Sequence, residues 1–376
     1  MTATAWFANV RDRDWTCLPP SREAIAFHRG LDGYAPTRLV PLPTLATELG
    51  VGHVFAKDES ARLGLPAFKA LGASWAVHRT LRDREPDGPV TIVTATDGNH
   101  GRAVARFARL LGHRASIVIP PGVHPSAVQA IVDEGASVTQ VEGSYDDAVA
   151  AAANLAESTG GVLVQDTAWD GYTEIPGWIV EGYATLFAEA DEQLAEAGLG
   201  APTLVIVPVG VGSLLQGALT HYRGDRAKLG TAVASVEPMA AACVAPSLAA
   251  GEPVTVQTEL TVMTGLNCGT PSTTAWPYIK AGLDAAIAVT DEADIQAAHD
   301  LAALGVRAGP CGAAGLAAAR RALRADGTDG TDGTDGTADV VTVDARRRHL
   351  GVGADSVVLL VVTEGSDANP VPGLEA

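Results

Sequence analysis

Three short segments carry residue types that could do chemistry, and the first centres on a lysine. Lys69 stands among apolar and small residues between Pro66 and Ser74, where we expect a helix to begin. Loss of solvation and the positive end of a helix would both lower the pKa of its amine, which suits Schiff-base chemistry with a carbonyl group. Taken alone, a lysine in such a place is more often a packed or paired surface residue.

The second segment, Thr94 to Gly101, lies between an expected strand and an expected helix. Gly98 and Gly101 would let the backbone approach a ligand, and the start of the helix offers free N–H groups. Asn99 could hydrogen-bond a ring oxygen, whereas His100 is interpreted as a capping or packing residue.

The third segment, Pro208 to Leu214, again lies between a strand and a helix. Gly210, Gly212 and Ser213 at a helix N-terminus would form a cradle of backbone N–H groups for a phosphate. The segment does not continue into the full dinucleotide fingerprint, and no acidic partner for a ribose is evident. A single phosphate is therefore the better match.

The elements that position these segments alternate between short β-branched runs and helical stretches. This alternation indicates an α/β fold with mostly parallel sheets that helices cover on both faces. Ligands of such sheets bind at the carboxyl ends of the strands, so the polar and glycine residues just after each strand are the candidates for binding. We expect strands at 90–94, 116–119, 137–141, 161–165 and 203–207, and helices at 102–111, 125–134, 145–157 and from about 214.

Composition narrows the class of protein. The 376 residues, 47% hydrophobic and 19% charged, suit one large or two medium domains with a sizeable core. The net charge of −18 argues against a nucleic-acid partner and against an anionic membrane surface. The run Val357 to Val362 is far shorter than the roughly 20 residues that span a bilayer, and no secretory signal is recognised. Four cysteines without a CxxC pair argue against structural zinc, so we expect a cytoplasmic protein with no metal.

One segment stands apart, because residues 326–337 repeat Asp-Gly-Thr four times. The repeat has no apolar face and too many glycines to fold alone, so we expect a low-complexity surface loop. It also lacks the ligand spacing and the final Glu of an EF-hand.

Taken together, the three segments resemble the fold-type II pyridoxal-phosphate (PLP) enzymes of the tryptophan-synthase β family. Three further runs add to the resemblance: Gln165 to Trp169, the stretch 263–269 and Val362 to Gly365. Within this family, the sequence is most similar to the enzymes that act on 2,3-diaminopropionate. Serine and threonine dehydratases of the same fold carry a serine where Asp97 stands, and they lack the Gln165 to Trp169 run.

The resemblance implies the fold and the reaction. It implies a large PLP-binding domain at 1–89 and 173–376 with a small domain at 90–172 inserted into it, each with a helix-covered, mostly parallel sheet. It implies elimination of 2,3-diaminopropionate to pyruvate and two ammonia through an aminoacrylate intermediate, in a homodimer that binds a small amino acid.

The resemblance also implies roles for single residues. Lys69 would hold PLP as a Schiff base, Asn99 would bond its phenolic oxygen, and Thr363 would face its pyridine nitrogen. Asp97 and Asp166 would be the catalytic carboxylates near the substrate, whose second ammonium group calls for negative charge. The phosphate would be bound by the loop residues Gly210, Val211, Gly212, Ser213 and Leu214.

Alternatives remain open at this point. A serine or threonine dehydratase, or another β-eliminating or β-replacing PLP enzyme, is the first, and Asp97 with Asp166 argues against it. A non-catalytic amino-acid-binding protein is the second, and Lys69 argues against that. In the family, a cysteine pair can occur at places matching Cys243 and Cys268 near the mouth of the site, and the alternative is two buried free thiols.

Overall fold

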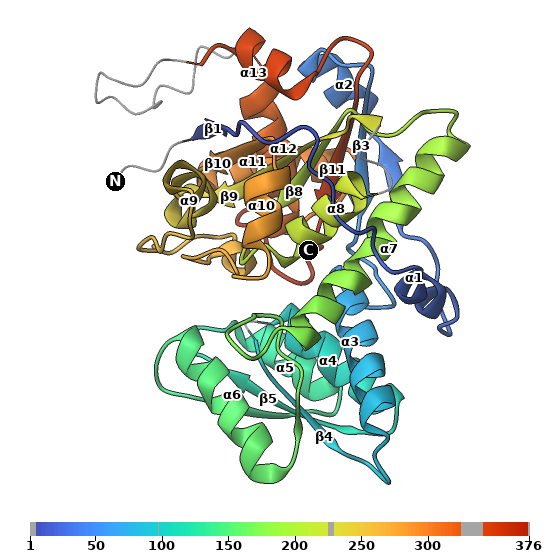
Figure 1. The fold of residues 1–376 in the computed structure, drawn as a ribbon, viewed down its shortest axis with the longest axis vertical. Coiled ribbons are helices and arrows are strands. Elements are labelled where there is room, and N and C mark those ends of the chain that lie inside the picture. The colour runs from blue at the N-terminus through green and yellow to red at the C-terminus, as the bar shows by residue number, and fades with distance from the viewer. Residues whose placement is uncertain (1–4, 97, 225–228, 325–340, 375–376) are drawn as a thin grey trace. The chain divides into compact units, whose positions relative to one another are not determined.

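The computed structural model describes residues 5–96, 98–224, 229–324 and 341–374 of the chain. By their contacts, the residues form two compact units, and each is described here by itself (Figure 1). The larger unit consists of Met1–Pro20, Pro36–Ala61 and Leu186–Ala376, and the smaller unit consists of Ser21–Ala35 and Arg62–Thr185. Asp97 and the Asp-Gly-Thr repeat at 326–337 lie outside the described residues.

The larger unit is built on a seven-stranded sheet with the order β1-β10-β9-β8-β11-β3-β2. The inner strands are parallel to one another, and β1 and β2 join the two edges in antiparallel pairing. Parallel strands are covered on both faces, and β11 accordingly reads Val-Val-Leu-Leu-Val-Val with every residue buried. The strands are β1 (Trp6–Ala8), β2 (Arg38–Pro41), β3 (His53–Asp58), β8 (Leu204–Pro208), β9 (Ala232–Pro238), β10 (Ala285–Val289) and β11 (Val357–Val362).

Helices of the larger unit cover this sheet. The alanine-rich α12 is buried along most of its length and contacts β8, β10 and β11, because its small side chains allow a close approach. The helices are α2 (Pro43–Leu49), α8 (Ser213–Arg223), α9 (Val244–Ala250), α10 (Trp276–Gly282), α11 (Asp291–Ala303), α12 (Pro310–Leu323) and α13 (Val343–Leu350), with 3₁₀ turns η2 (Met239–Ala241) and η3 (Thr264–Leu266). The long α7 (Glu174–Glu196) begins in the smaller unit and ends in the larger one.

The smaller unit contains a four-stranded, fully parallel sheet with the order β6-β5-β4-β7. Local signals set its helix ends; for example, Ser144 and Asp147 form a capping box at the start of α6, and Gly160 ends that helix in the left-handed conformation. The elements are α1 (Arg22–Arg29), α3 (Lys69–Arg84), β4 (Thr91–Ala95), α4 (Asn99–Leu110), β5 (Arg114–Ile119), α5 (Pro125–Asp133), β6 (Ser137–Gln140), α6 (Tyr145–Thr159) and β7 (Val162–Leu163).

The α/β class with mostly parallel sheets, predicted from the sequence, is confirmed. The strands and helices expected between residues 90 and 165 are present, although α4 begins at Asn99 rather than 102 and β7 is only two residues long. The compact units also divide the chain elsewhere than at 90 and 172, because α3 packs on α4 and α1 packs on α3. The domain bounds drawn from the sequence stay a prediction. Among the described residues, no helix has the length and apolar character needed to cross a membrane.

Candidate active site

Lys69 is the first residue of α3 in the smaller unit, and its ammonium group is paired with a carboxylate. Its Nζ donates a hydrogen bond to Oδ2 of Asp166 at 2.6 Å. The lysine side chain is 25% exposed and the aspartate side chain is 9% exposed, so the pair lies at the edge of the interior. Two of the three predicted catalytic residues therefore meet, although they are 97 positions apart in the sequence.

A close contact between α3 and α7 fixes the start of the lysine helix. A Cβ atom added at Gly72 would lie 2.6 Å from the ring of Tyr183, and one added at Gly182 would lie 2.6 Å from the carbonyl oxygen of Leu71. Phe68, just before the lysine, packs against Tyr183 with ring centroids 4.8 Å apart. The two glycines let the helices approach closely, and this contact positions Lys69 one turn before Gly72.

Asp166 follows β7 and is held by the fully buried amide of Gln165. Oε1 of Gln165 accepts hydrogen bonds from Oγ1 of Thr94 at 2.8 Å and from the backbone N–H of Ala95 at 2.9 Å. Its Nε2 donates to Oδ1 of Asp166 at 3.3 Å. Gln165 thus ties the end of β4 to the carboxylate, and Oδ2 remains directed at Lys69.

The charge state of Asp166 follows from two opposing effects. Burial alone would raise the pKa of this carboxyl group, because it disfavours the charged form. Burial is the largest single effect, but the charge and hydrogen bond of Lys69, together with His100 and a backbone hydrogen bond, outweigh it and lower the pKa from 3.8 to about 2. Asp166 is therefore an anion at neutral pH.

His100 lies beside this pair, in the first turn of α4. Its ring is buried, and Nε2 is 2.9 Å from the carbonyl oxygen of Val164. Its Nδ1 lies 4.0 Å from Oδ2 of Asp166. Burial lowers the pKa of His100, although Asp166 acts in the opposite direction, so the ring is neutral near pH 7. The sequence-based interpretation as a packing residue explains its burial but not its place beside the carboxylate.

The turn before α4 is organised by Thr96. Its Oγ1 accepts hydrogen bonds from the backbone N–H groups of Gly98 at 2.9 Å and Gly101 at 3.0 Å. Gly98 has a φ of 152°, a conformation that favours glycine, and a Cβ atom on Gly101 would collide with the side chain of Thr96. Gly101 therefore makes room for the chain itself, which corrects the prediction that it admits a ligand. Asn99 is half-buried at the first position of the helix.

In the larger unit, the predicted phosphate loop connects β8 to α8. Gly212 has a φ of 104°, and no side chain caps the start of α8, so N–H groups of its first turn keep their donor capacity. Added Cβ atoms would lie 2.9 Å from the carbonyl oxygen of Gly265 at Gly210, and 3.1 Å from the Cβ of Ala275 at Gly212. Neighbouring protein atoms thus leave little room for a side chain at either position. The rest of the loop comprises Val211 and Ser213, which are half-buried, and Leu214, which is buried.

Thr363 lies at the same edge of the sheet as this loop, because it follows β11 and β11 pairs with β8. The residue is 3% exposed. Its Oγ1 is buried and has no hydrogen-bond partner among the described residues. Leaving a buried hydroxyl unpaired costs about 1–3 kcal/mol, so this atom is suited to a polar group of a bound ligand.

Two cysteines, Cys243 and Cys268, lie near the loop. Sγ of Cys243 lies 3.3 Å from Oε1 of Glu237, and burial followed by this carboxylate raises the pKa of the thiol well above its usual value. Sγ of Cys268 would lie 3.3 Å from a Cβ atom on Gly210. Cys243 is buried and Cys268 is half-buried, and the two are not joined by a disulfide in the structure.

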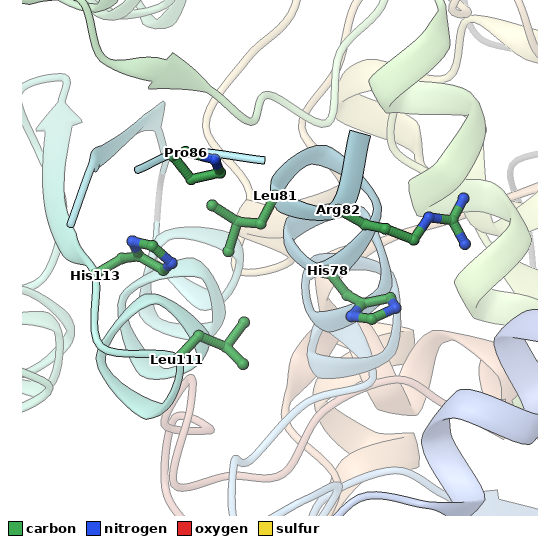
Figure 2. A pocket seen from close by; sticks show the side chains of 6 residues that line it. All are labelled: His78, Leu81, Arg82, Pro86, Leu111 and His113. Carbon is green, nitrogen blue, oxygen red and sulfur yellow. The ribbon is translucent and has the colours of Figure 1, made fainter. Parts of the chain in front are cut away.

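A surface pocket of the smaller unit is a separate feature (Figure 2). It lies toward the C-terminal end of α3, and His78, its first residue on that helix, is about 13 Å along the axis from Lys69. None of the predicted site residues lines it; the lining residues are His78, Leu81, Arg82, Pro86, Leu111 and His113.

A mostly parallel α/β fold, a lysine paired with a mostly buried carboxylate and a glycine-rich loop before a helix point to the class of enzymes that hold a phosphate-bearing cofactor on a lysine. The chain belongs to the family of pyridoxal-phosphate dependent enzymes, whose pattern matches residues 31–343. Within that family it is similar to diaminopropionate ammonia-lyase from Salmonella typhimurium, with 40% identity over 291 residues that cover 72% of each chain.

Solved structures show the same similarity. The crystal structure of holo diaminopropionate ammonia lyase from Escherichia coli superposes with a TM-score of 0.83 at 30% identity, covering 98% of this chain and 96% of that one. The same enzyme in complex with an aminoacrylate-PLP azomethine reaction intermediate gives a TM-score of 0.82 at 31% identity, covering 97% and 95%.

The cofactor of this family is pyridoxal phosphate, and the residues present fit it. The N-terminus of α8 has no side-chain cap and favours a phosphate, and Gly210 and Gly212 let the loop before it pack closely against Gly265 and Ala275. The unpaired hydroxyl of Thr363 at the same sheet edge fits a ring nitrogen. Lys69 supplies a primary amine for a carbonyl group.

Proposed function

We propose that this enzyme eliminates ammonia from 2,3-diaminopropionate. The substrate and one water molecule give pyruvate and two molecules of ammonia, one from each nitrogen. Similarity to diaminopropionate ammonia-lyases along most of the chain supports the reaction.

The observation that carries the proposal is the contact between Lys69 and Asp166. A mostly buried carboxylate lies 2.6 Å from Nζ of Lys69, and this contact supports a negative charge close to the proposed reacting atoms. Diaminopropionate has an ammonium group at Cβ, whereas serine and threonine have a neutral hydroxyl group there. A permanent anion is suited to the first kind of substrate, because it stabilises the charged leaving group before it departs as ammonia.

The residues then have distinct proposed roles. Bound PLP supplies an electron sink for the carbanion at Cα. Lys69 holds the cofactor and, when released, its amine can take the Cα proton from its own side of the substrate. Asp97 takes that proton from the other side, and Asp166 binds the β-ammonium group. Asn99 and Thr363 orient the ring, and the loop Gly210, Val211, Gly212, Ser213 and Leu214 binds the phosphate.

The proposal includes a homodimer in the cytoplasm that binds a small amino acid. The family resemblance supports the homodimer, and the low number of cysteines, four without a CxxC pair, supports a reducing compartment. Sedimentation velocity of the purified holoenzyme at several concentrations measures its oligomeric state and tests the homodimer.

Product stoichiometry tests the reaction itself. Holoenzyme is incubated separately with D- and L-2,3-diaminopropionate, L-serine and L-threonine, and both keto acid and ammonia are quantified. We expect two ammonia per pyruvate from diaminopropionate and the highest kcat/KM with that substrate. Lys69→Ala is the matched control and is expected to lose both turnover and the visible absorption of the lysine-bound cofactor. If the wild-type enzyme prefers serine or threonine, the proposed reaction is wrong and the enzyme is a dehydratase.

A further inference from the structure

The neutral ring of His100 has a fixed arrangement of protons. The carbonyl oxygen of Val164, 2.9 Å from Nε2, can only accept a hydrogen bond, so Nε2 carries the proton. In a neutral imidazole the other nitrogen is then a bare acceptor. Nδ1 of His100 is therefore an acceptor, and it is buried without a hydrogen-bond partner in the part of the chain that is described.

This bare acceptor lies close to an anionic oxygen. Nδ1 of His100 lies 4.0 Å from Oδ2 of Asp166, and the same Oδ2 accepts from the ammonium of Lys69 at 2.6 Å. The other carboxylate oxygen is engaged by Gln165. His100 itself is 4% exposed, so its acceptor nitrogen is shielded from water.

The spacing of the two acceptors fits one primary ammonium group. An ammonium nitrogen that donates two hydrogen bonds of about 2.8 Å, along roughly tetrahedral directions, holds its acceptors roughly 4–4.6 Å apart. Oδ2 and Nδ1, at 4.0 Å, meet this requirement with a modest bend of the bonds. The ammonium of Lys69 on Oδ2 shows that this place accepts such a group.

We propose that His100 is a specificity-determining residue, because its Nδ1 and Oδ2 of Asp166 together bind the β-ammonium group of the substrate. This inference rests on the proposed function and adds a second acceptor to it. Because Nζ of Lys69 would serve first the cofactor and then the Cα proton, the β-ammonium can take the place of the lysine ammonium on Asp166. A β-hydroxyl group has one proton and no charge, so it cannot satisfy both acceptors.

The bond changes of the elimination balance without a proton from His100. When the Cβ–N bond breaks, its electron pair stays on nitrogen, and the β-ammonium leaves as ammonia with its three hydrogens. The pair of electrons from the Cα–H bond forms the new double bond, and the proton goes to the base at Cα. His100 stabilises the charged β-ammonium group by accepting a hydrogen bond from it, and it donates no proton.

Two substitutions separate binding from packing. His100→Asn keeps an acceptor oxygen near the position of Nδ1 but loses the bond to Val164, whereas His100→Gln keeps a donor near Nε2 and loses the acceptor. We expect His100→Asn to have the lower melting temperature and to retain KM for diaminopropionate within a few-fold. His100→Gln is expected to raise that KM at least tenfold and to change kcat/KM for serine much less.

The test uses the holoenzyme, with KM and kcat for diaminopropionate and serine, melting temperature and cofactor absorption measured in all three proteins. Nitrogen-15 NMR of histidine-labelled protein at neutral pH should show a protonated Nε2 and a bare Nδ1 on His100, independently of turnover. His100 has only a packing role if each variant loses kcat/KM equally for both substrates and the variant with the lower melting temperature loses more. Absence of diaminopropionate turnover in the wild type would instead overturn the proposed function together with this inference.

Discussion

The contact between Lys69 and Asp166 joins two residues that the sequence singled out for different reasons. The lysine was expected to be a poorly solvated amine, and the aspartate was expected to lie near the substrate. In the structure they neutralise each other, with the carboxylate mostly buried. A buried charge is stable only when it is paired, so the pair explains how an aspartate remains ionised at this depth.

The two proposed catalytic carboxylates, Asp97 and Asp166, should differ in their effect on the two enantiomers of the substrate. Lys69 can remove the Cα proton from one side only, so a D substrate needs a base on the other side. We expect Asp97→Asn to lower kcat/KM for D-diaminopropionate by about 10²–10⁴ and to affect the L form much less. Asp166→Asn should lower both, because both enantiomers carry the β-ammonium group.

The measurement is kcat/KM for each enantiomer in the wild type and in both variants, with cofactor absorption as a check on loading. Small, equal losses in all four combinations would assign structural roles to both carboxylates and would favour a dehydratase.

At the scale of single elements, the contact between α3 and α7 sets the position of the lysine. Gly72→Ala would place a methyl group 2.6 Å from the ring of Tyr183, so we expect a loss of about 1–3 kcal/mol in unfolding free energy and a reduced kcat. Gly177→Ala on α7 is the matched control, because among the described residues no atom outside its own helix backbone and its chain neighbours lies within 4 Å of its added methyl group. That substitution should be neutral or stabilise by up to about 1 kcal/mol. Urea unfolding of the wild type and both variants measures these free energies. An equal change of unfolding free energy in the two variants would contradict the close contact between α3 and α7.

Another element, α11, contains a buried carboxyl group that should make stability depend on pH. Neither oxygen of Asp294 has a hydrogen-bond partner among the described residues. Burial, then Asp291 and Glu364, raise the pKa of Asp294 from 3.8 to about 8. The folded protein thus holds a proton that the unfolded chain loses near pH 4. This contribution to stability is complete below about pH 4, falls as pH rises towards 8 and is constant above that.

Asp294→Asn should remove this decline and raise the unfolding free energy at pH 8 by about 1–3 kcal/mol relative to the wild type. Urea unfolding between pH 5 and pH 8 measures the difference. Glu292→Gln, an exposed position in the same helical turn, is the control and should follow the wild-type curve. Parallel curves for the wild type and Asp294→Asn would show that Asp294 is ionised in the folded state.

The sequence predicted the elements well where local signals define them. Apolar β-branched runs such as that of β11, and caps such as Ser144, act through neighbouring residues and can be read in order. The role of Gln165 could not be predicted, because its partners Thr94 and Ala95 are about 70 positions away. The position of His100 beside Asp166 could not be predicted for the same reason, because the two residues are far apart in the sequence. Its place directly after Asn99 was nevertheless a usable signal.

At the scale of the whole molecule, the Asp-Gly-Thr repeat should be dispensable. Arg347 on α13 donates a hydrogen bond to the carbonyl oxygen of Leu323, the last residue of α12, so the two helices meet close to the ends that the repeat connects. The residues left after deletion of 326–337 can still close this short distance. Halving a loop changes stability by only about 0.6 kcal/mol.

We therefore expect the deletion to shift the melting temperature by less than about 2 °C and to leave kcat/KM unchanged. Differential scanning calorimetry and the ammonia assay on the same preparation measure both. A drop in either quantity would assign the repeat a structural or catalytic role.

The order of strands in the larger sheet has a consequence for synthesis on the ribosome. β3 pairs with β11, which leaves the ribosome roughly 300 residues later. At 5–20 residues per second, this interval lasts roughly 15–60 s, during which β3 lacks its inner neighbour. All segments of the smaller unit have been made by residue 185, so that unit can fold while translation continues. The larger sheet forms last, and we expect nascent chains that stop before residue 357 to need chaperones and to aggregate without them.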